Sequence, residues 1–166
     1  MRNVLFFMLF ILNLTGAEFY YNYNNRIQSC INPQICKNWD IQGGMSGGQL
    51  SPNLKKINVC YWSKETPTKE RARELFVDII EYILFVYNSN ESIRPYLENY
   101  PYTTENIHLT IFFLNNSDNV GEVKAVGNNT ARINYSRARE NKYQRIELEL
   151  EDFSDAFRIV RGKEWD

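Results

Sequence analysis

Residues 66–88 constrain the fold of this chain more than any other stretch. They read TPTKERARELFVDIIEYILFVYN, and their apolar residues recur at the i, i+3, i+4 and i+7 spacing of one face of an α-helix. Thr66 suits the N-cap, and Pro67 suits the first turn, where its missing N–H needs no partner. The predicted buried stripe consists of Ala72, Leu75, Phe76, Ile79, Ile80, Ile83 and Tyr87. The predicted charged face consists of Lys69, Arg71, Arg73, Glu74, Asp78 and Glu81. Residues 82–87 are all apolar or aromatic, so we expect the last turns to be covered on nearly all sides.

Several segments around this helix alternate with the period of two that is typical of β-strands. The predicted strands are residues 55–62, 106–114, 120–126, 130–136 and 143–151. In the second of these, Ile107, Leu109, Ile111 and Phe113 point one way, and His108, Thr110, Phe112 and Leu114 point the other. In the last, we expect Ile146, Leu148 and Leu150 to face the core, and Arg145, Glu147, Glu149 and Glu151 to face water.

The order of these elements predicts the fold class. A short helix is expected after Ser92, and a terminal helix begins near Asp152 and ends near Gly162. The predicted order is therefore β-α-α-β-β-β-β-α, and the short connections favour antiparallel pairing. This is an α+β fold in which a long helix packs on a mostly antiparallel sheet of about five strands.

The core order of one strand, a long helix and four further strands resembles the arrangement of the cystatins. The resemblance covers topology, and it implies a sheet wrapped across one helix and inhibition of a protease. Cystatins carry a Q-x-V-x-G hairpin, and the nearest stretch here, residues 122–127, reads EVKAVG.

The N-terminal third is predicted to lie outside the folded domain. Residues 1–17 begin with a positive charge, continue with an apolar run and end in small residues, which is typical of a signal peptide cleaved after Ala17. Residues 18–53 are rich in Tyr and Asn and then in Gly and Ser, and they indicate a flexible, Cys-containing arm and linker. Residues 54–166 then form a single α+β domain. We expect the chain to be exported, to the periplasm or the extracellular space, with no membrane span after cleavage.

Export makes disulfides a reasonable expectation. The three cysteines are Cys30, Cys36 and Cys60, so at least one of them lacks a partner within the chain. Cys30 and Cys36 would close a short loop that contains Pro33, whereas a bond from either to Cys60 would tie the arm to the domain. Their spacing does not match a metal site, and the single histidine is distant in sequence, so no metal or other cofactor is predicted.

Three features are candidates for catalysis. Residues 44–48 match the G-x-S-x-G pattern around Ser46, but the strand before it and the helix after it that such an elbow needs are not predicted. His108 is a candidate general base, although the pattern places no nucleophile beside it. Glu147, Glu149 and Glu151 would share a strand face and could act as paired carboxylates or bind Ca²⁺, or they could pair with Lys124 and Arg132 on neighbouring strands.

These observations favour a non-catalytic function. No adequate catalytic constellation is predicted, so no catalytic residue is assigned. The net charge is −1 without a long basic run, so the footprint of a nucleic-acid-binding protein is missing. We therefore predict an exported interaction module with an unknown protein partner. The alternatives are a small secreted hydrolase that uses His108 or the Glu147/Glu149 row and, more weakly, a cystatin-like protease inhibitor.

Overall fold

The computed structural model describes residues 25–51, 53–114, 120–126, 132–138 and 145–165. Within these residues six strands form one sheet: β1 (Gln42–Ser51), β2 (Asn53–Ser63), β3 (Ile107–Phe113), β4 (Glu122–Val126), β5 (Arg132–Ala138) and β6 (Arg145–Asp152). The described α-helices are an N-terminal helix at 25–39, α2 (Lys69–Ser89) and α3 (Phe153–Arg161). Short 3₁₀ turns, η1 (Arg94–Tyr96) and η2 (Thr104–Asn106), connect α2 to β3. The predicted α+β class is confirmed, with six strands where about five were expected.

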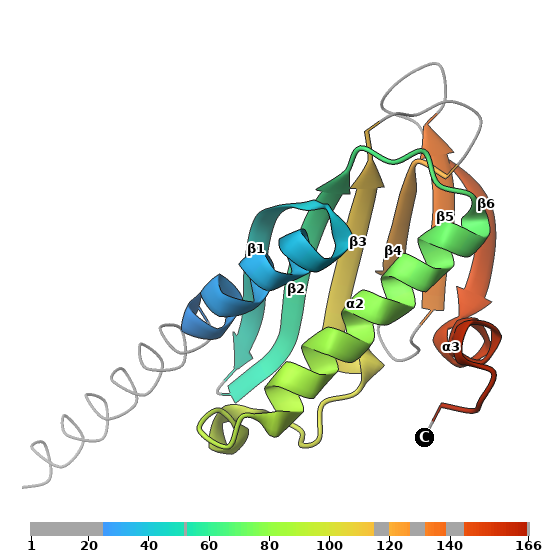
Figure 1. Ribbon diagram of the computed structural model, residues 1–166. Coiled ribbons are helices and arrows are strands. Elements are labelled where there is room, and N and C mark those ends of the chain that lie inside the picture. The colour runs from blue at the N-terminus through green and yellow to red at the C-terminus, as the bar shows by residue number, and fades with distance from the viewer. Residues whose placement is uncertain (1–24, 52, 115–119, 127–131, 139–144, 166) are drawn as a thin grey trace, which may run out of the picture.

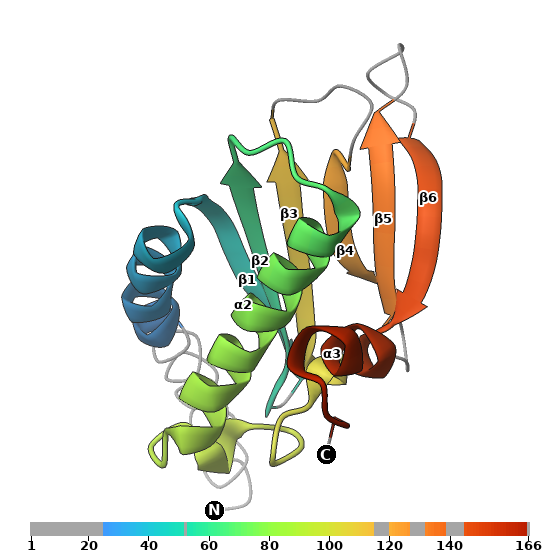
Figure 2. The ribbon, with the colours of Figure 1, turned by 45° about the vertical axis from the view of Figure 1, so that its right-hand side comes forward.

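The strands follow their sequence order across the sheet, β1-β2-β3-β4-β5-β6. Every described pair is antiparallel except β2 and β3, which are parallel because α2 crosses over the sheet between them. The N-terminal helix, α2 and α3 all lie on the same face of the sheet (Figures 1 and 2). Among the described residues, no helix lies on the opposite face. The fold therefore has two layers, with its core between the helices and the inner face of the sheet.

Helix α2 supplies the centre of this core, as its sequence predicts. The whole predicted stripe from Ala72 to Tyr87 is buried. The helix starts two residues later than expected: the N-cap is Thr68, whose side chain accepts a hydrogen bond from the backbone N–H of Arg71 at 3.3 Å. Pro67 therefore precedes the cap rather than following it.

Two residues of α2 depart from the prediction. Arg73, assigned to the charged face, is only 6% exposed because it forms an ion pair with Glu151 of β6. Phe85, in the run that we expected to be covered, is 68% exposed. The reason is geometric: near its C-terminal end α2 presents one side to the sheet, and the described residues leave the opposite side uncovered.

The prediction of a flexible arm is wrong for residues 25–51. Ile27, Ile31 and Ile35 repeat every four residues along the N-terminal helix and are buried in the core. The helix ends where Asp40 adopts a positive φ of 50° and the N–H of Ile41 donates to the carbonyl of Cys36 at 3.2 Å, a helix-terminating geometry. Residues 42–51 then form β1, the edge strand beside β2.

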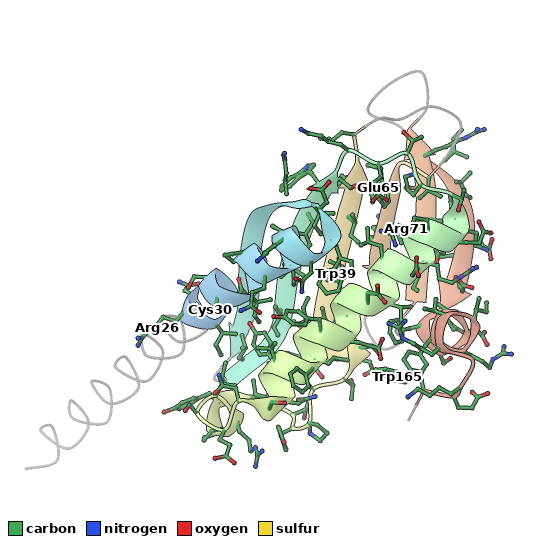
Figure 3. The ribbon with its side chains drawn as sticks, viewed as in Figure 1. Arg26, Cys30, Trp39, Glu65, Arg71 and Trp165 are labelled. Atoms are coloured by element: carbon green, nitrogen blue, oxygen red, sulfur yellow. The ribbon has the colours of Figure 1, made fainter. Side chains whose placement is uncertain are left out.

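Polar and aromatic contacts fix the N-terminal helix to the rest of the fold. Trp39 lies between the N-terminal helix and α2 (Figure 3). It donates its indole N–H to Asp78 of α2 at 3.2 Å and packs edge-on against Tyr82, with 5.7 Å between the ring centroids. The hydroxyl of Tyr61 in β2 donates to Asn32 at 2.7 Å. The helix is therefore part of the core layer.

Strand β6 is the main correction to the predicted sheet. The pairing of β5 with β6 shifts between Tyr135 and Ser136, because Leu148 is an extra residue in the bulge between Glu147 and Glu149. As a result Glu149 and Glu151 point toward the helical layer, whereas Leu148 and Leu150 are 44% and 46% exposed. The prediction that these leucines face the core and all three glutamates face water is therefore wrong.

The inward glutamates are accommodated by a cluster of polar side chains. Glu151 accepts two hydrogen bonds from Nε of Arg73, at 3.1 and 3.0 Å, and one from the hydroxyl of Tyr135 at 2.8 Å. Both charged side chains are only 8% exposed. Glu149 pairs with Lys69, whose ammonium lies 5.6 Å from the ring centroid of Tyr135. Burial, followed by the hydrogen bond to Glu151, raises the pKa of Tyr135, which keeps its hydroxyl a donor.

Candidate binding surface

The face of the sheet opposite the helices is the candidate functional site, and we call it the open face. Its residues alternate along the strands with the buried inward-facing residues. Register places them in rows that run across the strands from β2 to β6. One row consists of Cys60, Thr110, Lys124, Asn134 and Leu150, and the next consists of Trp62, Phe112, Glu122, Ser136 and Glu147. Lys56, Asn58 and His108 lie at the start of β2 and β3.

An aromatic cluster occupies one end of the open face. Trp62 and Phe112 are direct partners on the parallel strands β2 and β3, and their rings stack with centroids 6.1 Å apart and planes 27° apart. Both are half-buried. Leu114, two residues beyond Phe112, is 54% exposed. The stacked pair therefore forms an apolar area that continues to Leu114.

A second apolar area lies on β6, at the other side of the same face. Leu150 is the cross-strand partner of Asn134, and Leu148 lies in the adjacent bulge. Both leucines are nearly half exposed. The sequence prediction missed this area because a regular strand would have placed both leucines in the core.

Polar pairs occupy the middle of the open face. The ammonium of Lys124 lies 3.6 Å from the carboxylate of Glu122, whose side chain is 8% exposed. The side-chain amide of Asn134 donates to Glu147 at 2.5 Å. The centre is therefore polar and internally neutralised, and apolar areas flank it on both sides.

The electrostatics of the open face do not favour nucleophilic catalysis. Burial, with a further contribution from Glu122, raises the pKa of the Cys60 thiol, so this thiol stays protonated at neutral pH. Desolvation, with Lys56 and Lys124 adding to it, lowers the pKa of His108, so its imidazole is neutral there. Because its pKa is raised, the Cys60 thiol lacks the lowered pKa of an activated cysteine. In register, His108 is paired with Asn58, and Cys60 is paired with Thr110 one step further along the strands.

The structure does not bring together the candidate catalytic residues that the sequence suggested. Ser46 lies within strand β1, opposite Val59, so the G-x-S-x-G stretch does not form a strand–turn–helix elbow. Glu147 is on the open face and hydrogen bonds to Asn134, whereas Glu149 and Glu151 are on the inner face. The three glutamates therefore do not form a shared row. Lys124 pairs with Glu122 rather than with them, and the side chain of Arg132 is outside those described.

The three candidate disulfide cysteines are free in the described structure. Cys30 and Cys36 lie on one helix and not on a loop, and six residues of helix separate them by about 9 Å along the axis. A disulfide requires Cα atoms within about 7 Å. Cys36 packs near Gly43 and Tyr61 on the inner side of the sheet, whereas Cys60 is on the open face.

Comparisons with known proteins give no information on the function of this surface. No protein-family model matches the chain, and neither the curated proteins nor the solved structures contain a significant match. Within the described residues, no group of three or more His, Cys, Asp or Glu side chains is arranged to hold a metal ion. The same part of the chain contains no helix with the length and apolar character that a membrane span requires.

Proposed function

We propose that this chain is an exported, non-catalytic interaction module that binds a protein partner through its open face. The observation that carries the proposal is a pair of apolar areas at the two sides of the open face, over which the described residues place no helix: the stacked Trp62 and Phe112 on one side, and the half-exposed Leu150 on the other. Antiparallel sheets often leave one face to water, but that face is then mainly polar. Exposed aromatic and aliphatic side chains that lie together are typical of contact surfaces.

A protein partner fits this surface better than a nucleic acid or a small molecule. Nucleic-acid binding needs a concentration of positive charge, whereas the central Lys124 is neutralised by Glu122 and the chain has a net charge of −1. The apolar groups of the open face lie at its two sides, on β2 and β3 and on β6, which suits a broad contact. A hydrolase that uses His108 or the Glu147/Glu149 row has less support, because Glu147 and Glu149 lie on opposite faces and the register partner of His108 is Asn58, which is not a nucleophile.

Site-specific photo-cross-linking tests the proposal. A photoreactive phenylalanine analogue at Thr110 would lie in the middle of the open face, and the same analogue at Phe85 would lie on the exposed side of α2 as a matched control. We expect irradiation in the native secretion or extract to give defined protein adducts from position 110 and none of the same mass from position 85. Equal labelling from both positions, or labelling from position 85 alone, would show that the open face is not the contact surface.

Export is a separate part of the proposal with its own measurement. The predicted signal peptide implies that the released protein begins at Glu18. N-terminal sequencing or intact-mass analysis of the material that a host cell secretes reads this directly. Material that keeps Met1 and stays with the cell membrane would contradict it.

A further inference from the structure

We propose that Asn90 accepts an N-linked glycan when the chain passes through a secretory compartment that contains an oligosaccharyltransferase. This modification site is independent of the open face, and it rests only on the export that the proposed function includes. The transferase recognises Asn-x-Ser/Thr, where x is any residue except proline. Within the described residues this pattern occurs at 90–92, which read NES, and at 134–136, which read NYS. Further matches, outside the described residues, begin at Asn13, Asn115 and Asn128.

The first of these patterns lies where α2 ends. Asn90 is the C-cap of the helix, and the connection that it begins lies at one end of the two-layer fold (Figure 1). Asn90 is half-buried, and Glu91 and Ser92 are exposed. The side-chain oxygen of Asn90 accepts a hydrogen bond from the backbone N–H of Ser92 at 3.0 Å. Within the described residues, neither the amide nitrogen of Asn90 nor the hydroxyl of Ser92 has a hydrogen-bond partner. The two groups that the transferase uses are therefore both available.

The second pattern lies in the middle of the sheet, on β5. Asn134 pairs across the strands with Lys124 and Leu150, and only 7% of its surface is exposed. Its amide nitrogen donates to Glu147 at 2.5 Å, and Ser136 is 3% exposed. A glycan on Asn134 would replace that hydrogen bond and would need space that neighbouring side chains occupy, whereas glycans are bulky groups of the protein surface. The fold therefore accommodates a glycan at Asn90 and excludes one at Asn134.

The reaction is a glycosyl transfer in which the donor is an oligosaccharide joined through a diphosphate to a polyprenol lipid. The amide nitrogen Nδ2 of Asn90 forms a bond to the anomeric carbon of the first sugar, and the bond from that carbon to the diphosphate oxygen breaks. The amide loses one proton, and the lipid diphosphate leaves with the bonding electrons, so nothing is oxidised or reduced. Transfer occurs as the chain enters the compartment, and a chain that is modified at a buried position is not expected to fold.

Secretion of the full chain from a eukaryotic host cell, followed by peptide mass mapping, tests this inference. A peptide N-glycosidase releases the glycan and converts the asparagine that carried it to aspartate, and water enriched in heavy oxygen distinguishes this change from spontaneous deamidation. We expect the labelled aspartate at position 90 and an unmodified Asn134. Ser92→Ala removes the hydroxyl that the transferase recognises and should abolish the glycan, whereas Ser92→Thr, the matched control, should retain it. Because Ser92 is exposed, circular dichroism should show that both variants are folded.

The outcomes separate this inference from the export on which it rests. An unmodified Asn90 in the secreted protein, or a glycan at Asn90 that persists in Ser92→Ala, would overturn the assignment, and so would a glycan on Asn134 of the folded protein. If the chain does not leave the cell with its own residues 1–17, the predicted export fails, and the host's signal peptide in their place still allows Asn90 to be measured. In that form, a glycan at Asn90 supports the site, and an unmodified Asn90 overturns it.

Discussion

The two faces of the sheet each contain residues that a simple alternating pattern would not place there. The inner face carries Glu149 and Glu151 against the helical layer, and the open face carries Trp62 and Leu150 without a covering layer among the described residues. The exceptions are resolved differently. Each inward glutamate has a cationic partner within the chain, whereas the described part of the chain leaves the outward apolar groups partly exposed. We interpret the exceptions that the chain satisfies by itself as structural, and the partly exposed apolar groups are the basis of the partner surface that we propose.

The largest loss of stability is expected from a charge placed in the centre of the inner face. Ile79 of α2 is fully buried, so Ile79→Asp would place a charge where the described residues provide no partner, at a cost of several kcal/mol. We expect the variant to lose cooperative unfolding in urea. The matched change Phe85→Asp, at a position that is 68% exposed, should cost less than about 1 kcal/mol. Similar urea curves for the two variants would mean that the layers are not packed as described.

The next largest loss of stability is expected from a substitution in the polar cluster on the inner face. Glu151→Ala leaves the guanidinium of Arg73 buried without its carboxylate, which costs about 3–5 kcal/mol in comparable buried pairs. Glu149→Ala breaks a more exposed pair with Lys69, where about 0–1 kcal/mol is expected. Thermal or chemical denaturation of both variants compares two adjacent inward positions of one strand. Equal losses would argue that the bulge at Leu148 does not bury Glu151.

A smaller effect on stability, and on its pH dependence, is expected from His108 on the open face. Its pKa in the folded protein is lowered below the ordinary value of 6.5 by desolvation and by Lys56 and Lys124. As the pH falls below about 6.5, the unfolded chain therefore takes up this proton first, and stability is lost until the pH passes the lower folded pKa. His108→Gln should remove this component of the pH dependence and leave stability at pH 8 nearly unchanged. An identical pH profile for both proteins between pH 7 and pH 5 would refute the desolvation of His108.

The smallest expected effect is that of divalent cations. If Glu147, Glu149 and Glu151 formed one site, a cation at a hundredfold excess over its Kd would add about 2.7 kcal/mol of stability. Because the bulge places Glu147 on one face and the other two on the opposite face, we expect equal melting temperatures in millimolar Ca²⁺ and in chelator. A rise of several degrees that Glu149→Gln abolishes would require a site that joins the two faces.

Much of the fold could be predicted from local patterns. The stripe from Ala72 to Tyr87 identifies α2, and the alternation of residues 107–114 identifies both faces of β3. Gly162, with φ of 68°, ends α3 where the sequence predicted the helix to end. These features are set within one or two turns or strand repeats, so a short window of sequence contains the information that specifies them.

Less of the candidate site could be predicted from local sequence patterns. The outward position of Trp62 and Phe112 followed from alternation, but their stacking required the parallel register of β2 and β3, which α2 sets. Leu150 was assigned to the wrong face. An alternating pattern shows which residues share a face but not which face is covered, and a one-residue bulge exchanges the two.

By itself, then, the sequence determined the long helix, the approximate positions of the strands after β1 and the α+β class, because these depend on the spacing of apolar residues along the chain. Only the tertiary structure decided that the Gly-rich residues 42–51 form an edge strand, since β2 supplies the hydrogen-bonding partners that their own composition does not predict. It also decided that Arg73 is buried and Leu150 is exposed. Both follow from the bulge in β6, which turns Glu151 toward α2, and a buried carboxylate is stable there only with a cation beside it.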